Sequence, residues 1–128
     1  MFSLTSSHRY YLYRKPVDMR KSFDGLCGIV SNQMNCDATT GEVYIFINRL
    51  RDKIKLLHWE SGGFVLYYKR LESGTFKLPR LQNDTFNHHE IDWTGLILMI
   101  EGITVKTFRQ QKRFLIGANE KVKNMGSY

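Results

Sequence analysis

The sequence predicts an α+β fold: an antiparallel β-meander packed against one main helix, with a second short helix near the C-terminus. Residues 43–78 form short strand-like segments separated by turn residues, which is typical of antiparallel hairpins. Residues 19–34 and 93–101 instead carry apolar side chains at helical spacing. With 128 residues, 42% of them hydrophobic, the chain fits one domain, expected over residues 1–118, with a loose tail at 119–128.

The N-terminal part predicts a strand followed by the main helix. Residues 9–14 read as a short strand, and Pro16 ends it because the residue before a proline is pushed toward extended geometry. Asp18 is expected to cap the helix that follows. Gly25 and Gly28 weaken that helix relative to alanine, so we expect tertiary packing to compensate or the glycines to allow a close approach to the sheet. The helical stripe consists of Met19, Phe23, Leu26, Val30 and Met34.

The meander is expected to contain four strands, at residues 43–48, 53–59, 64–70 and 75–78. The polar segment 80–92 reads as a surface loop or as the lead into the second helix. That helix is expected at Trp93–Glu101, with Gly102 suited to the position after its last turn.

The strand pattern assigns the side chains to two faces of the sheet. If Asn48 pairs with Lys53 and Trp59 with Phe64, one face is almost wholly apolar and should lie under the main helix. That face holds Val43, Ile45, Ile47, Ile54, Leu56, His58, Val65 and Tyr67. The opposite face has an apolar end at Trp59, which the second helix could cover, and a basic-aromatic end. The basic-aromatic end groups Phe46, Lys53, Lys55, Tyr68 and Arg70.

Aromatic rings beside cations on a sheet can stack bases while the cations contact phosphate, so the basic-aromatic end is a candidate nucleic-acid contact. The alternative is that its lysines keep the sheet soluble and unpaired. The net charge of +7 is distributed in blocks: residues 1–23, 43–80 and 102–128 are basic, and residues 24–42 and 81–101 are acidic. A polarised surface of this kind suits polyanions, or an acidic protein patch. In a helix, Lys106, Arg109 and Arg113 would share one face, suited to a DNA backbone or to solvent and protein docking.

Other chemistry finds little support in the residues. The adjacent His88, His89 and Glu90 are poorly placed to converge on a metal ion. There is no phosphate-binding loop, dinucleotide fingerprint or nucleophile elbow, so we expect no enzyme activity, cofactor, metal or small-molecule substrate. Cys27 and Cys36 are expected to be reduced thiols in a cytoplasmic protein, with a disulfide as the alternative. The longest apolar run, Leu96–Ile100, is too short to span a bilayer, so no membrane partner is expected.

Two segments carry a family resemblance. HRYYLYRKPVDMRKSFDGLCGIV and GEVYIFINRLRDKIKLLHWESGGFVLYYKRLESGTFKLP resemble, in order and separation, the TnpB-type accessory proteins of the insertion-sequence-sixty-six family of bacterial transposons. The resemblance covers about residues 8–80. It implies a non-catalytic role in transposition beside a separate DDE-type transposase. The basic-aromatic end and the charge blocks make element-end DNA an expected partner, and the transposase or other element-encoded proteins are the other expected partners.

The resemblance carries over no catalytic residues. The positions in its motifs that are expected outside the core are Arg14, Arg20, Lys21, Arg49, Arg51, Lys53, Lys55, Lys69 and Arg70. Together with Phe46, Tyr68 and the C-terminal cations, they are the candidate DNA contacts. The alternative function is a protein adaptor that docks on the transposase through the acidic 81–101 block and the Trp59/Phe64 end. A third hypothesis, a metal-dependent nuclease, would require cleavage that a chelator abolishes.

Overall fold

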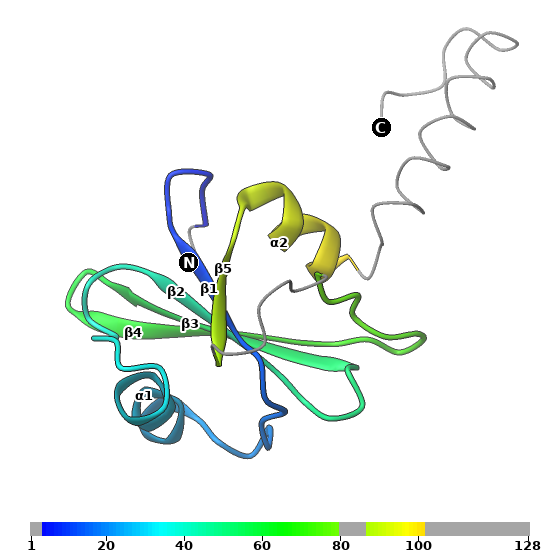
Figure 1. Cartoon of the computed structure of the whole chain (residues 1–128), viewed down its shortest axis with the longest axis horizontal. Coiled ribbons are helices and arrows are strands. Elements are labelled where there is room, and N and C mark those ends of the chain that lie inside the picture. Colours follow the sequence, from blue (N-terminus) through cyan, green and yellow to red (C-terminus); the bar gives the residue numbers. More distant parts are fainter. Residues whose placement is uncertain (1–3, 80–86, 102–128) are drawn as a thin grey trace, which may run out of the picture.

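The computed structural model describes residues 4–79 and 87–101, which form one five-stranded sheet and two helices. The strand order is β4-β3-β2-β1-β5. In chain order the elements are β1 (Tyr10–Tyr13), α1 (Phe23–Asn32), β2 (Val43–Ile47), β3 (Lys53–Glu60), β4 (Gly63–Arg70), β5 (His88–Ile91) and α2 (Trp93–Ile100). The predicted α+β class is confirmed (Figure 1).

The sheet is mixed rather than wholly antiparallel. The β2-β3-β4 meander is antiparallel as predicted, with Trp59 opposite Phe64 and the Asn48 amide donating to the Lys53 carbonyl at 3.2 Å. However, β1 runs parallel to β2, and α1 forms the connection that a parallel pair requires. The β3–β4 turn has positive φ at Ser61 (52°) and Gly62 (82°), the geometry of a type I′ hairpin.

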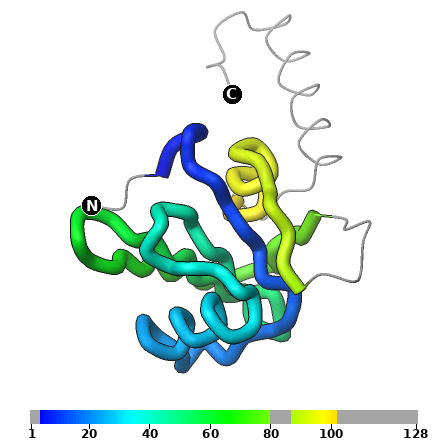
Figure 2. The backbone as a smooth tube through the Cα atoms, turned by 60° about the vertical axis from the view of Figure 1, so that its left-hand side comes forward, coloured from blue at the N-terminus to red at the C-terminus, as the bar shows by residue number. Residues whose placement is uncertain are grey.

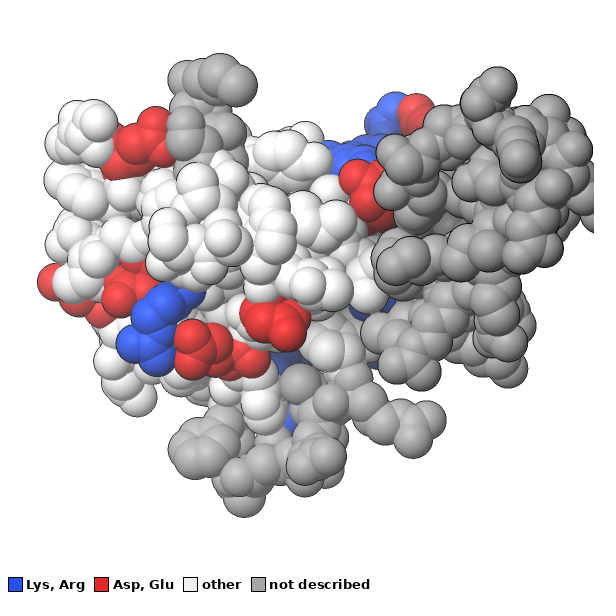
Figure 3. All heavy atoms as spheres, turned by 90° about the horizontal axis from the view of Figure 1, so that it is seen from above, with Lys and Arg blue, Asp and Glu red and all other residues white. Residues whose placement is uncertain are grey.

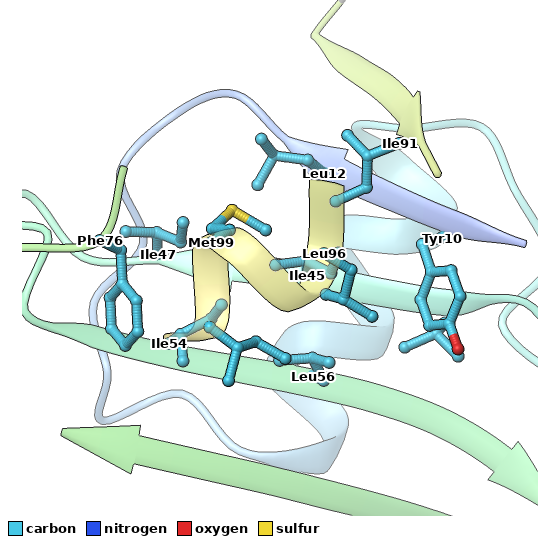
Figure 4. Packing of buried hydrophobic residues seen from close by; sticks show 12 residues of the cluster. Tyr10, Leu12, Ile45, Ile47, Ile54, Leu56, Phe76, Ile91, Leu96 and Met99 are labelled. Atoms are coloured by element: carbon cyan, nitrogen blue, oxygen red, sulfur yellow. The ribbon is translucent and has the colours of Figure 1, made fainter. Parts of the chain in front are cut away.

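Each face of the sheet is covered by a different helix, and this corrects the expected arrangement. The face of Ile45 and Leu56 packs against α2, not α1, through Leu96 and Met99 (Figure 4). Figure 1 shows α1 and α2 on opposite sides of the sheet. The predicted grouping of residues on this face is right, but the helix assigned to cover it was wrong.

Helix α1 covers the opposite face, for which the sequence predicted a basic-aromatic end and an apolar end that the second helix could cover. Leu26 and Val30 of α1 pack with Tyr44, Phe46 and Leu57 in a second buried cluster. Consequently every residue of β2 is buried. The sheet is the middle layer between two helices. Because both of its faces are buried, the side chains of β2 are apolar whichever face they point to.

The ends of α1 differ from the prediction. The helix begins at Phe23 after Ser22, whose side chain makes no capping hydrogen bond. Asp18 does not cap it; its carboxylate instead accepts from the backbone and side chain of Arg20. A Cβ at Gly28 would meet no atom within 4 Å, so this glycine is not needed for a close approach to the sheet.

Two segments between β4 and α2 were also misassigned. Residues 75–78 are not a strand, although Phe76 is buried and its amide donates to the Arg51 carbonyl at 2.6 Å. The segment His88–Ile91 is strand β5, paired antiparallel with β1; Figure 2 shows the two side by side. Helix α2 matches the prediction, and Asp92 caps it by accepting from the Gly95 amide at 2.7 Å.

Several predictions fall outside the described residues. They concern Gly102, the cations Lys106, Arg109 and Arg113, and the tail at 119–128. Within residues 4–79 and 87–101, neither helix has the length and apolar character needed to cross a bilayer.

Candidate nucleic-acid interface

An open cleft of about 710 Å³ lies where the connection from β1 to α1 meets the turn between β2 and β3. The connection is held in place because the Val17 amide donates to the Ile47 carbonyl at 2.9 Å. We call this hollow the basic cleft. Its lining consists of Pro16, Val17, Asp18, Met19, Arg20, Asn48, Arg49, Leu50, Lys53 and Tyr68.

Tyr68 presents an aromatic ring at the basic cleft. It lies on the edge strand β4 and is 51% exposed. The Lys55 ammonium lies 4.5 Å from the centroid of its ring, a cation–π contact. An exposed ring of this kind is suited to stacking on an unpaired base or sugar.

Lys55 is a structural lysine. Its side chain is buried, and its ammonium donates at 2.8 Å to the carbonyls of both Met19 and Lys21. Burial lowers the pKa of Lys55 below the ordinary value for lysine. Lys55 therefore ties the cleft wall to β3 instead of offering a free charge to a ligand.

Arg20 stands on the opposite wall with its side chain 92% exposed. Its guanidinium is paired with Asp18, with a shortest N–O distance of 2.6 Å. Hydrogen bonds from the Arg20 side chain and backbone lower the pKa of Asp18 to about 2. The carboxylate in the cleft wall is thus engaged by a neighbouring cation, and Arg20 is held in position by it.

The β2–β3 turn supplies the rest of the wall. Asn48 organises it: its side-chain oxygen accepts from the amides of Asp52 and Lys53 at 3.1 and 3.0 Å, and its side-chain nitrogen donates to Asp52 at 2.6 Å. This arrangement lowers the pKa of Asp52, chiefly through the Asn48 hydrogen bond. Arg49 and Arg51 are exposed on either side of Leu50, which is 70% exposed.

A smaller hollow of about 290 Å³ adjoins the basic cleft and shares Lys53 and Tyr68 with it. Arg70 and Glu72 complete it. These two exposed side chains form an ion pair at 2.8 Å, and the carboxylate raises the pKa of Arg70. The aromatic and cationic surface therefore continues along the end of β4.

Not every predicted contact reaches this surface. Phe46 is fully buried under α1, so its ring cannot stack on a base, and this prediction was wrong. Lys69 lies on the α2 side, where its ammonium donates to the Ile100 carbonyl at 3.0 Å. Arg14 is half-buried on the connection after β1 and does not line the basic cleft. Lys21 is exposed on the same connection, but its side chain is not part of the lining.

The sequence interpretation missed Leu50, Met19 and Pro16 as lining residues. Leu50 could have been noticed because an apolar residue between two arginines is unusual in a turn, where polar residues and glycine prevail. The two others gave no such signal, because their place depends on how the connection folds back over β2.

A second hollow of about 670 Å³ lies at the other end of β3. Its lining includes Glu42, His58, Trp59 and Glu60. The Trp59 and Phe64 rings meet edge-to-face, with centroids 4.9 Å apart. Charged side chains therefore lie near both ends of β3, with Lys53 at its start and Glu60 at its end.

The face seen from the α2 side is different again. It shows scattered acidic and basic side chains on a largely uncharged surface, without a continuous basic patch among the coloured residues (Figure 3).

Across residues 4–79 and 87–101 there is no group of three His, Cys, Asp or Glu side chains placed to hold a metal ion. Cys27 and Cys36 are free thiols.

The structure is that of a small α+β protein with an open cleft lined by the cations Arg20, Arg49 and Lys53. Residues 8–110 match the model of the family described as IS66 Orf2 like protein, so the chain belongs to this family. The family gives the chain a transposition-associated accessory role. The chain is also similar to the uncharacterized protein y4jC of Sinorhizobium fredii (strain NBRC 101917 / NGR234), with 26% identity over 98 residues covering 77% of this chain and 84% of that protein. No solved structure is a significant match.

Proposed function

We propose that this protein is a non-catalytic transposition factor that binds DNA at the ends of its mobile element through the basic cleft. The observation that carries the proposal is that the β1–α1 connection lies beside the β2–β3 turn. The contact brings Arg20 of the connection, Arg49 and Lys53 of the turn region, and Tyr68 of β4 into one open hollow, although these three segments are separate in the sequence.

The charges around the basic cleft favour a polyanion. Asp18 is paired with Arg20, and Asp52 is engaged by Asn48 and lies 3.7 Å from the Lys53 ammonium. Arg49 and Arg51 are exposed beside them. Contacts between such cations and phosphates release counterions, so binding should weaken steeply with salt.

The test is a fluorescence-anisotropy titration of the full chain against a labelled duplex of the element's terminal repeat and a scrambled duplex, at two salt concentrations. Salt-sensitive binding supports the proposal, and preference for the terminal repeat supports end recognition. Arg49→Gln and Lys53→Gln should each weaken binding to both duplexes and reduce the salt slope by about 1.

Arg9→Gln is the matched control. Arg9 is an exposed cation in an ion pair with Glu90, and it lines the hollow at the far end of β3. Its replacement should leave DNA affinity unchanged. No binding at low salt, or an equal loss in Arg9→Gln and Arg49→Gln, would overturn the assignment to the basic cleft.

The alternative function is a protein adaptor that docks on the transposase. The observation in its favour is the hollow with Glu42, Trp59 and Glu60, which offers carboxylates and an indole to a basic protein segment. Light scattering of a mixture with the transposase tests it. A complex that Trp59→Ala weakens and Lys53→Gln leaves intact supports docking at this end, whereas the absence of any complex removes the adaptor function.

A further inference from the structure

The turn between β2 and β3 carries the most exposed of the large apolar side chains in the described residues. Leu50 is 70% exposed, compared with 51% for Tyr68 and 43% for Phe23. Single apolar residues are common on protein surfaces and need no special function. Leu50 differs from such residues because exposed arginines, Arg49 and Arg51, flank it on both sides.

The backbone holds this turn in a fixed conformation. Arg51 has a φ of 59°, a left-handed conformation that is uncommon for a residue other than glycine. Its amide donates to the Asn48 carbonyl at 3.1 Å, and its own carbonyl accepts from the Phe76 amide at 2.6 Å. The Asp52 carbonyl likewise accepts from the Leu71 amide at 2.7 Å.

Two consequences follow from these bonds. The segment after β4 is hydrogen-bonded to the backbone of the turn and holds it in place, so Leu50 lies at the tip of a hairpin with a fixed conformation. Because the backbone of the turn is already ordered in the free protein, contacts between its side chains and a partner should cost little further backbone entropy.

The chemistry of the Arg49-Leu50-Arg51 turn indicates which partner it fits. An apolar pocket on another protein would have to take two guanidinium groups out of water beside the leucine, which is costly without buried partners. A DNA duplex offers both environments at once, with apolar base faces between steps and phosphates on either side. Proteins that kink DNA from the minor groove commonly insert an apolar wedge with cations beside it.

We propose that Leu50 inserts between adjacent base pairs from the minor groove while Arg49 and Arg51 contact the flanking phosphates, so that the protein kinks the DNA it binds. This inference rests on the proposed DNA-binding function and specifies its mode. The basic cleft adjoins the turn through Arg49, Leu50 and Lys53, so the kinked backbone would pass along it. A kink of about 20–90° is the range expected for such wedges.

Bending is measured by energy transfer between dyes at the two ends of a short duplex, and unstacking by the fluorescence of 2-aminopurine placed at successive steps. The wild-type chain should bring the dyes closer and raise 2-aminopurine fluorescence at one step. Leu50→Ala should still bind but lose both signals. Leu50→Met, which keeps an apolar side chain of similar length, should retain them.

Ile97→Ala is the matched control, because Ile97 is an exposed apolar residue on α2, 38% exposed. It should leave both signals unchanged. Thermal denaturation followed by circular dichroism verifies that each variant is folded, and Leu50→Ala should melt like the wild type because the side chain is exposed.

The outcomes separate the two levels of the proposal. Binding by the wild type without bending or unstacking overturns the wedge and leaves the DNA-binding function standing. Equal bending by wild type and Leu50→Ala also overturns it. No DNA binding at low salt removes both, and a loss of transposase binding in Leu50→Ala with unchanged bending would assign Leu50 to a protein contact instead.

Discussion

The ammonium of Lys55 lies 4.5 Å from the ring centroid of Tyr68, on the side of the sheet that α1 covers. The same ammonium donates to two carbonyls of the β1–α1 connection, those of Met19 and Lys21. One buried lysine therefore joins the connection, strand β3 and an exposed ring of strand β4. The shape of the basic cleft depends on this joint.

Replacing Lys55 with methionine should lower the free energy of unfolding by about 2–3 kcal/mol, because two charge-assisted hydrogen bonds to loop carbonyls are lost. Urea denaturation measures this. Lys53→Met is the control, since the contact of Lys53 with Asp52 is long and partly exposed, and its loss should change stability by less than about 1 kcal/mol. Equal stability losses in the two variants would contradict the structural role of Lys55.

Lys69 is expected to stabilise the end of α2. Its ammonium donates to the carbonyl of Ile100, the last residue of α2, and its positive charge interacts favourably with the negative end of the helix dipole. Lys69→Met should lower stability by about 1 kcal/mol and speed amide hydrogen exchange in α2. Lys69→Arg should recover part of the loss, and unchanged exchange in Lys69→Met would show that the contact contributes nothing.

Gly28→Ala should stabilise the protein by about 0.5–1 kcal/mol, because alanine favours the helix and the new methyl group meets no atom within 4 Å. Gly25→Ala provides the comparison. Its Cβ would lie 3.2 Å from the Lys21 Cβ, so the gain should be smaller or absent. Thermal denaturation of both variants checks the order, and destabilisation by Gly28→Ala would mean that α1 packs more closely there than described.

Stability should decrease below about pH 6.5 because His58 is buried. Burial, and then the nearby His8, lower the pKa of His58, while Glu60 and the Gly41 backbone partly oppose this. The unfolded chain then takes up a proton at higher pH than the folded one. Neutral His58 contributes its full stabilisation at pH values above the pKa of His58 in the unfolded chain. This stabilisation is lost as the pH falls toward the lower pKa of His58 in the folded chain.

His58→Gln should flatten the decrease between about pH 7 and 5, as measured by urea denaturation at several pH values. Burial also lowers the pKa of His88, so part of the slope should remain in this variant. His88→Gln is the companion that removes that part. A slope in His58→Gln equal to that of the wild type would exclude His58 as its source.

The meander could be predicted from the sequence because its signals are local. Alternation of side chains and turn residues such as Ser61-Gly62 act over a few positions, and the register of β2, β3 and β4 followed from them. Strand β5 could not be predicted in this way. His88–Ile91 has no clear apolar alternation, and it is a strand because β1 offers its free backbone groups to it.

Some features of the candidate site could likewise be predicted from the sequence, and others could not. The cations of the β2–β3 turn and the exposed Tyr68 follow from the turn and the strand register. The buried position of Phe46 and the inward bonds of Lys55 and Lys69 do not, because they depend on which helix lies over which face.

Local signals in the sequence were enough to predict the α+β class, the two helices, the β2-β3-β4 meander with its register, and the family to which the chain belongs. Long-range contacts were needed to fix the parallel pairing of β1 with β2, the covering of both sheet faces, and the cleft between the β1–α1 connection and the β2–β3 turn. The reason is physical. Local periodicity and turn chemistry act over a few residues and can be recognised in the sequence. Both faces of the sheet are apolar, so either helix could pack on either face, and the chain connections and long-range backbone hydrogen bonds determine which helix covers which face.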